Sequence, residues 1–166
     1  MSVITRLDYE NGAYTTYEYS VEDDFYTVVT ETTSQGTNKY YYDPRFNMVM
    51  EEDKDEYRSH YGYDEETKDL IEEKTDGIVT RYFYDENGNL TKIMQGCEEL
   101  ENGILIVKAW ETVSIVTYDT FNRLISEKHG NEDEIRYTYD TNGNLIKVTE
   151  VKEETLEEIV TATYDS

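Results

Sequence analysis

The side chains best suited to catalysis or metal binding are few in this sequence. Histidine occurs only at His60 and His129, and Cys97 is the single cysteine. Neither histidine is close to Cys97 in the sequence, and the three residues lack the spacing of a zinc site or a cysteine nucleophile with its base. No Gly-x-Ser-x-Gly motif and no glycine-rich phosphate loop is present. We therefore predict a non-enzymatic protein with no cofactor and no metal site.

Two acidic segments, residues 85–89 and 140–144, resemble the start of a calcium loop. Such a loop needs glycine at its sixth position and a bidentate glutamate at its twelfth. Here the glycine is fourth, and the twelfth residues are Gly96 and Val151. A tight turn accounts for the same residues without a metal, and we expect turns.

The charge of the chain restricts its partners. Its 38 acidic and 15 basic residues give a net charge of −23, which repels nucleic acids and anionic membrane surfaces. The acidity indicates either simple solubility or a basic protein partner. With no apolar run of signal-peptide or membrane-span length, we expect a cytoplasmic protein if the chain is complete. The location stays open if the chain is a piece of a larger secreted or surface protein.

A Tyr-Asp dipeptide recurs along the chain, at tyrosine spacings of 21, 21, 34, 21 and 25 residues. We call its tyrosine the motif tyrosine, and a tyrosine two residues earlier the upstream tyrosine. The dipeptides are Tyr42-Asp43, Tyr63-Asp64, Tyr84-Asp85, Tyr118-Asp119, Tyr139-Asp140 and Tyr164-Asp165, with a weaker member at Tyr19-Ser20. The upstream tyrosines are Tyr17, Tyr40, Tyr61, Tyr82 and Tyr137. Gly88 and Gly143 follow four residues after the motif tyrosine, and Leu90, Leu124 and Leu145 follow six residues after it.

Each repeat predicts a strand, a turn, a second strand and a second turn. The Tyr-x-Tyr spacing places both tyrosines on one face of a strand, and the aspartate can start the turn. Glycine then supplies a left-handed position before leucine restarts a strand. The repeat at Tyr63 reaches its leucine, Leu70, one residue late, which indicates an extra residue in that turn. We predict a single all-β domain over residues 1–166, an antiparallel meander of roughly 12 to 14 strands, either a curved open sheet or a rolled barrel.

One repeat is longer than the others. The segment of about 91–117 reads as a lengthened hairpin with a turn at Asn102-Gly103, and it contains Trp110, the only tryptophan. An insertion in a repeat array often carries function, which makes Trp110 a candidate for a partner surface. Local cover for the tyrosine face is the other interpretation.

Residues 81–90 and 136–145 resemble the YD repeat of the Rhs and teneurin families. In those families the repeats form a long β-sheet that spirals into a hollow shell. The shell encloses a toxin domain in bacterial members and is part of an adhesion receptor in teneurins. The repeats of this chain are too few to form such a shell. The resemblance therefore implies a non-enzymatic β scaffold associated with a toxin.

Three functions follow from these observations. The first is a structural or protein-binding module that contacts neighbouring repeats or a basic toxin. The alternative is a small acidic immunity protein that neutralises a basic toxin. A minor alternative is a carbohydrate-binding surface, because tyrosine rings can stack on sugars.

Overall fold

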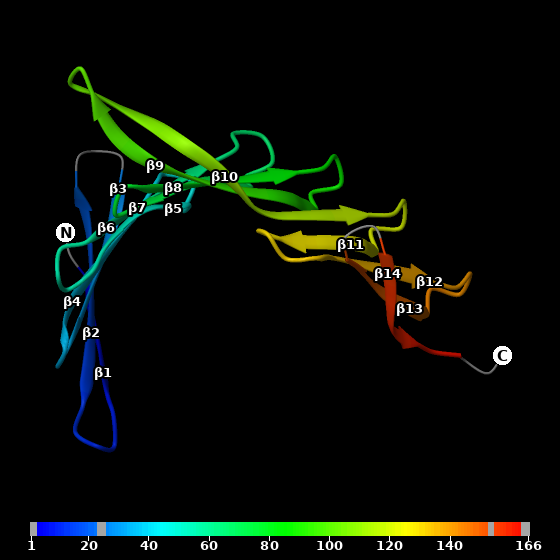
Figure 1. Cartoon of the computed structure of the whole chain (residues 1–166). Helices are drawn as coiled ribbons and strands as arrows, with labels where there is room; N and C mark the ends of the chain where they lie inside the picture. Colours follow the sequence, from blue (N-terminus) through cyan, green and yellow to red (C-terminus); the bar gives the residue numbers. More distant parts are fainter. Residues whose placement is uncertain (1–2, 23–25, 153–154, 164–166) are drawn as a thin grey trace. The chain divides into compact units, whose positions relative to one another are not determined.

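The computed structural model describes residues 3–22, 26–152 and 155–163, and Tyr164 and Asp165 lie outside these ranges. Every regular element within them is a β-strand (Figure 1). None of the described residues forms a helix that could span a membrane. The strands are β1 (Val3–Asp8), β2 (Tyr14–Glu22), β3 (Tyr26–Thr33), β4 (Gly36–Tyr42), β5 (Met48–Glu52), β6 (Arg58–Tyr63), β7 (Leu70–Thr75), β8 (Ile78–Tyr84), β9 (Leu90–Glu101), β10 (Ile104–Tyr118), β11 (Leu124–His129), β12 (Glu134–Tyr139), β13 (Leu145–Lys152) and β14 (Thr155–Thr161).

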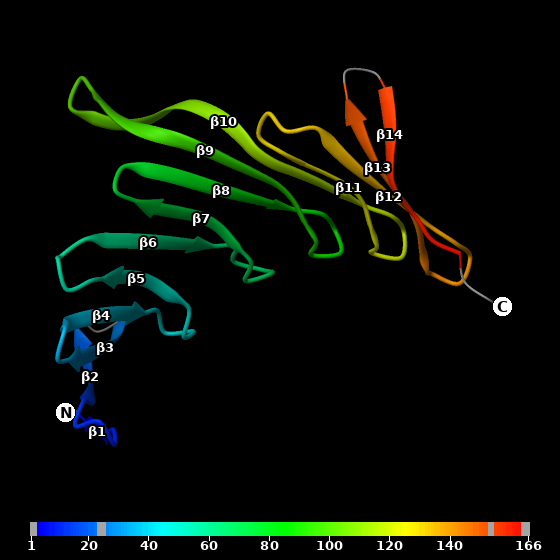
Figure 2. The same ribbon diagram turned by 60° about the horizontal axis from the view of Figure 1, so that its bottom comes forward.

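The strands form one 14-stranded sheet in which each strand neighbours the next one in the chain (Figure 2). This is the antiparallel meander that the repeats predict. In the described residues β1 pairs with β2 and β14 pairs with β13, so the sheet is open and the rolled-barrel alternative does not apply. The chain forms two compact units, unit 1 (Met1–Val79 with Glu98–Ile106) and unit 2 (Thr80–Cys97 with Val107–Ser166).

The sheet is a single layer, with almost no hydrophobic core. Among the described residues, only Val28 and Val79 are fully buried apolar side chains. Val28 lies on β3 between Ser20 of β2 and Tyr41 of β4. Most other side chains in the strands are half-buried or exposed. The units are therefore stabilised mainly by ladder hydrogen bonds and by contacts between side chains on adjacent strands.

A β-bulge precedes the motif tyrosine in four repeats. The register shifts there, and the tyrosine then lies opposite the residue that restarts the next strand. The opposed pairs are Tyr42 with Met48, Tyr63 with Leu70, Tyr118 with Leu124, and Tyr139 with Leu145.

The turn after the motif tyrosine has the predicted left-handed residue. Gly88 has φ of 82° and Gly143 has φ of 90°, while Asn122 and Phe46 reach 59° and 67° at the equivalent position. In the repeat at Tyr63 the left-handed residue is Lys68, with φ of 70°, because the extra residue moves this conformation one place along the chain.

The longest strands, β9 and β10, contain 12 and 15 residues. They lie in the segment where a lengthened hairpin is expected. Asn102 and Gly103 connect them, both with positive φ (52° and 82°).

Candidate functional site

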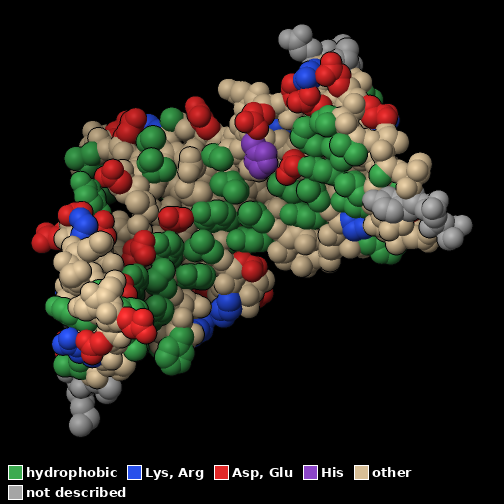
Figure 3. Space-filling model, turned by 90° about the horizontal axis from the view of Figure 1, so that it is seen from below, with side chains coloured by type: hydrophobic (Ala, Val, Ile, Leu, Met, Phe, Trp, Pro, Cys, Tyr) green, Lys and Arg blue, Asp and Glu red, His purple; other side chains and the backbone are tan. Residues whose placement is uncertain are grey.

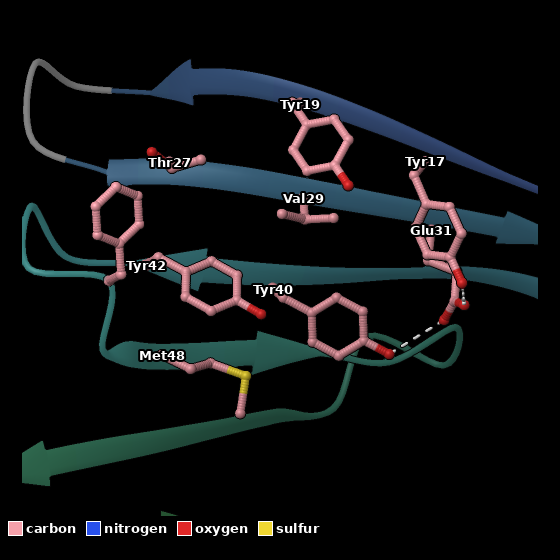
Figure 4. A pocket seen from close by; sticks show the side chains of 9 residues that line it. Tyr17, Tyr19, Thr27, Val29, Glu31, Tyr40, Tyr42 and Met48 are labelled. Carbon is pink, nitrogen blue, oxygen red and sulfur yellow. Dashed lines mark hydrogen bonds between the residues drawn. The ribbon is translucent and has the colours of Figure 1, made fainter. Parts of the chain in front are cut away.

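In unit 1 the repeat tyrosines of β2 and β4 share one face of the sheet, which we call the tyrosine face. In unit 1, Tyr17, Tyr19, Tyr40 and Tyr42 extend from β2 and β4 to the same side (Figure 4). Seen in space-filling view, hydrophobic and tyrosine side chains gather over the strands, with carboxylates scattered among them and along the margins (Figure 3). The sequence prediction that both tyrosines of a repeat lie on one face holds for these residues.

The upstream tyrosines of β2 and β4 share one carboxylate. The Tyr17 hydroxyl donates to Oε1 of Glu31 at 3.0 Å, and the Tyr40 hydroxyl donates to Oε2 at 3.2 Å (Figure 4). The hydrogen bond to Glu31 raises the pKa of Tyr17, and burial followed by the Glu31 charge raises the pKa of Tyr40. The surroundings of both side chains therefore favour the neutral phenol form.

Two later upstream tyrosines repeat this arrangement with other glutamates. The Tyr61 hydroxyl donates to Oε1 of Glu51 at 2.9 Å, and Tyr137 donates to Oε1 of Glu127. Burial and then the bond to Glu51 raise the pKa of Tyr61 to about 12. The bond to Glu127 and then burial raise the pKa of Tyr137 to about 12. The sequence analysis missed these glutamates, although Glu51 and Glu127 both follow their motif tyrosine by nine residues.

The motif tyrosines have a different partner, the backbone of the preceding repeat. The hydroxyls of Tyr63, Tyr118 and Tyr139 donate to the carbonyl oxygen of the residue that restarts a strand after the preceding Tyr-Asp turn. The pairs are Tyr63 with Met48 at 3.0 Å, Tyr118 with Leu90 at 3.3 Å and Tyr139 with Leu124 at 2.9 Å. A motif tyrosine thus connects two successive repeats, whereas an upstream tyrosine binds a neighbouring carboxylate.

The aspartate of the dipeptide holds the turn together. Asp140 Oδ1 accepts backbone N–H groups of Asn142 and Asn144 at 2.9 and 2.8 Å, and Oδ2 accepts the Asn144 side-chain amide at 2.9 Å. The side-chain bond from Asn144, then the backbone bonds, lower the pKa of Asp140. Asp85 makes the same three bonds within its own turn. These carboxylates therefore bind the backbone and the asparagine side chain of their own turns. The part of the chain that the structure describes contains no cluster of three or more metal-ligating side chains.

A ladder position that the sequence analysis did not identify carries small buried hydroxyl residues. Thr15, Ser59, Thr80 and Ser114 each lie four residues before a motif tyrosine or its Tyr19 equivalent, and all are buried. Ser59 accepts a hydrogen bond from Thr75 at 2.8 Å. Alignment of the repeats on the motif tyrosine would have shown this position from sequence.

Trp110 packs against the sheet in unit 2. The Arg81 guanidinium lies 4.6 Å from the centroid of the Trp110 ring, and a Cβ added to Gly96 would approach Trp110 Cδ2 to 3.0 Å. The partner-surface role of Trp110 remains a prediction.

The histidines and the cysteine are exposed on separate strands, His60 on β6, Cys97 on β9 and His129 on β11.

A groove on the tyrosine face of unit 1 has a volume of about 570 Å³. It runs across β2, β3 and β4 to the turn before β5 and to Met48 at the start of β5. Its lining includes Tyr17, Tyr19, Glu31, Tyr40, Tyr42 and Phe46.

Comparisons with known proteins agree with this repeat geometry. Residues 118–155 match the family model described as RHS Repeat. No curated protein matches the sequence.

Three solved structures share the fold. The Tc holotoxin pore of Photorhabdus luminescens with a TccC3 mutation aligns with a TM-score of 0.53 at 17% identity over 88% of this chain. The TcdB2–TccC3–Cdc42 complex and the TcdB2–TccC3 complex each align with a TM-score of 0.52 at 17% identity over 91% of this chain. This chain spans 11%, 11% and 12% of the respective matched chains. Residues 118–155 thus match an RHS repeat, the Tyr-Asp turns extend the same pattern along the chain, and the fold is shared with these toxin structures.

Proposed function

We propose that this chain is a non-enzymatic scaffold module of a toxin-associated YD-repeat protein, and that it binds protein through its sheet. The single-layer sheet is the observation that carries the proposal. With only Val28 and Val79 fully buried among the described apolar residues, most apolar and tyrosine surface is available for a covering partner. The matched solved structures are toxin complexes of several proteins, which supports the toxin association.

The two edge strands offer a second contact surface, for neighbouring repeats. In the described residues β1 and β14 each pair on one side, which leaves backbone N–H and C=O groups of the other side for another strand. Apolar side chains on both strands are exposed, for example Ile4 at 66% and Ile159 at 53%. Strand addition at these edges would continue the meander.

The acidic surface favours a second candidate, an immunity protein for a basic toxin. A net charge of −23 would accelerate encounter with a basic domain and select against acidic ones. This candidate requires a discrete complex with one partner, whereas the scaffold candidate requires edge pairing or an extended contact.

Light scattering after size-exclusion chromatography separates the two candidates. We expect the purified chain to self-associate as its concentration rises, and we expect Ile159→Lys on β14 to reduce this association. The matched control is Ile71→Lys, a similarly exposed isoleucine on an interior strand, which leaves the edge intact. A chain that stays monomeric and forms a one-to-one complex with a basic protein from its own locus would instead establish the immunity role.

A further inference from the structure

The groove of unit 1 combines aromatic rings with a single carboxylate. The rings of Tyr17, Tyr19, Tyr40 and Tyr42 lie along it, and Glu31 lies between Tyr17 and Tyr40 (Figure 4). All lining residues come from unit 1. Tyrosine faces attract cations through the ring quadrupole, and a nearby carboxylate adds charge of the matching sign.

Glu31 retains acceptor capacity after its two tyrosine bonds. Each of its oxygens accepts one hydroxyl, from Tyr17 and from Tyr40. A carboxylate offers about four acceptor sites, so further N–H donors can bind to it. The tyrosine bonds also hold the carboxylate in place, which lowers the entropic cost of binding a ligand.

Phe46 marks the same groove by its backbone conformation. It has φ of 67° and its side chain is 80% exposed. Glycine, asparagine and lysine occupy the equivalent position in other repeats, at Gly88, Gly143, Asn122 and Lys68, so an aromatic ring at this position is specific to the groove. Phe46 lines the groove, so its ring is available to a ligand there.

In unit 2, an arginine side chain stacks on the ring of a motif tyrosine. The Arg123 guanidinium lies 4.7 Å from the ring centroid of Tyr139, a motif tyrosine, and 5.3 Å from that of Phe121. Tyr42 is the corresponding motif tyrosine in the groove. Arg6, Arg81, Lys92 and Arg123 stack on rings of the described residues, and none of these four stacks on a ring of the groove.

We propose that the groove binds an arginine side chain of a basic protein segment, with the guanidinium stacked on the tyrosine rings and its N–H groups bound to Glu31. Arginine fits better than lysine because its planar guanidinium stacks on aromatic faces and bonds a carboxylate in a fork. The net charge of −23 favours the same basic partner. This inference rests on the protein-binding role proposed above and names the chemistry of the partner.

Fluorescence anisotropy with labelled oligoarginine and oligolysine peptides of equal length tests the proposal on the full chain. We expect oligoarginine to bind at least about threefold more tightly than oligolysine. Glu31→Gln should weaken oligoarginine binding by about fivefold, because it removes the charged acceptor and keeps the shape. Glu18→Gln is the matched control, since Glu18 is exposed, lies one residue from Tyr17 and Tyr19 on the opposite face, and changes the net charge equally. We expect at most a small effect from it.

Phe46→Gly separates binding from folding. This variant should keep or raise the melting temperature, because glycine relieves the positive φ, while oligoarginine binding weakens by about threefold. Tyr42→Leu should also weaken binding, whereas Tyr57→Leu, an exposed tyrosine outside the groove lining, should not.

Equal affinity for the two peptides, or equal effects of Glu31→Gln and Glu18→Gln, would mean general attraction to an acidic surface and would overturn the proposal. Preferred binding of an acidic or uncharged apolar peptide would overturn it as well. In either case edge-dependent self-association would still support the scaffold function, so failure of the groove is distinguishable from failure of the scaffold.

Discussion

The hydroxyl of Tyr139 donates a 2.9 Å hydrogen bond to the backbone carbonyl oxygen of Leu124, which lies 15 residues earlier in the preceding repeat. The same relationship joins Tyr63 to Met48, also across 15 residues. These motif tyrosines, like Tyr118, thus bond the backbone where the preceding repeat restarts its strand. Because so few of the described apolar side chains are fully buried, such side-chain bonds between repeats supply part of the stability that burial supplies in a two-layer protein.

Removal of this hydroxyl should weaken the fold. We expect Tyr139→Phe to lower the free energy of unfolding by about 1 kcal/mol, the usual contribution of one hydrogen bond, as measured by urea denaturation. Tyr57→Phe is the control, because Tyr57 is 63% exposed, and it should change stability little. Equal effects of the two variants would show that the bond to Leu124 contributes nothing.

Acid should act on the Tyr-Asp turns. The Asn89 side-chain bond, followed by the backbone bond, lowers the pKa of Asp85, and Asn144 does the same for Asp140. A lowered folded-state pKa stabilises the fold above the ordinary aspartate pKa of about 4, and this stabilisation disappears as the pH falls through the folded value. The Asp85→Ala, Asp140→Ala double variant should therefore melt at a lower temperature than the wild type near neutral pH.

The difference in melting temperature should shrink as the pH falls through the lowered pKa values of the two wild-type carboxylates, because they then become protonated as well. Asp133→Ala serves as the control, since Asp133 is an exposed acidic residue in the turn between β11 and β12. A difference that stays constant with pH would contradict the role of the ionised carboxylates.

Alkali should act on the upstream tyrosines. The Glu127 bond, then burial, raises the pKa of Tyr137 to about 12. This raised pKa stabilises the fold at pH values below the ordinary tyrosine pKa of about 10, and the stabilisation is lost as the pH rises toward the folded value. We expect Glu127→Gln to lower the pKa of one tyrosine toward 10. Tyrosinate absorbance measures this titration, and the Tyr137→Phe variant identifies which tyrosine it belongs to. Glu132→Gln, a change in an exposed turn, should leave the titration where it is.

Backbone strain predicts opposite effects at two equivalent turn positions. Gly88 has φ of 82° with nothing within 4 Å of an added Cβ, so Gly88→Val should destabilise through backbone strain alone, by about 1–3 kcal/mol. Phe46→Gly should stabilise by about 1 kcal/mol, because it removes the strain at φ of 67°. Thermal or urea unfolding measures both. A destabilised Phe46→Gly variant would mean that the Phe46 ring packs usefully in the turn.

Close packing of β9 against β10 predicts a cost for any side chain at Gly96. A Cβ there would lie 2.7 Å from Val107 Cγ1 and 3.0 Å from the Lys108 carbonyl oxygen. Gly96→Ala should lower stability by about 1–3 kcal/mol and shift the fluorescence of the nearby Trp110. Gly62→Ala is the control, because its nearest contact would be an ordinary 3.6 Å. An unchanged Trp110 spectrum with unchanged stability would contradict this packing.

Much of the fold could be predicted from sequence because its determinants are local. The turn at Asp85 and the left-handed Gly88 depend on residues a few positions apart, so the repeat spacing reveals them. The acceptors of the tyrosine hydroxyls depend on pairing between strands instead. Glu31 follows Tyr19 by 12 residues, whereas Glu51 follows Tyr42 by nine, because the hairpins differ in length and only one contains a bulge.

Closure of the sheet could not be predicted for a similar reason. An open sheet and a closed one have the same repeat period and the same alternation, since both are built from identical hairpins. Only the pairing of the first and last strands distinguishes them, and no local pattern in the sequence encodes that pairing. The left-handed conformation of Lys68 could not be predicted either. An alignment of the repeats shows that a residue has been added to this turn, but not which residue takes the left-handed conformation.

The turn that follows Tyr63 also has an evolutionary consequence. It contains one more residue than its counterparts, yet Leu70 still pairs with Tyr63 and Glu73 with Tyr61. The added residue is absorbed within the turn and the ladder on either side keeps its register. This turn thus takes up an added residue without changing the register of the strands beside it. Duplication of a whole repeat would likewise add two strands whose contacts are confined to their neighbours, and the existing turns and pairings would stay as they are.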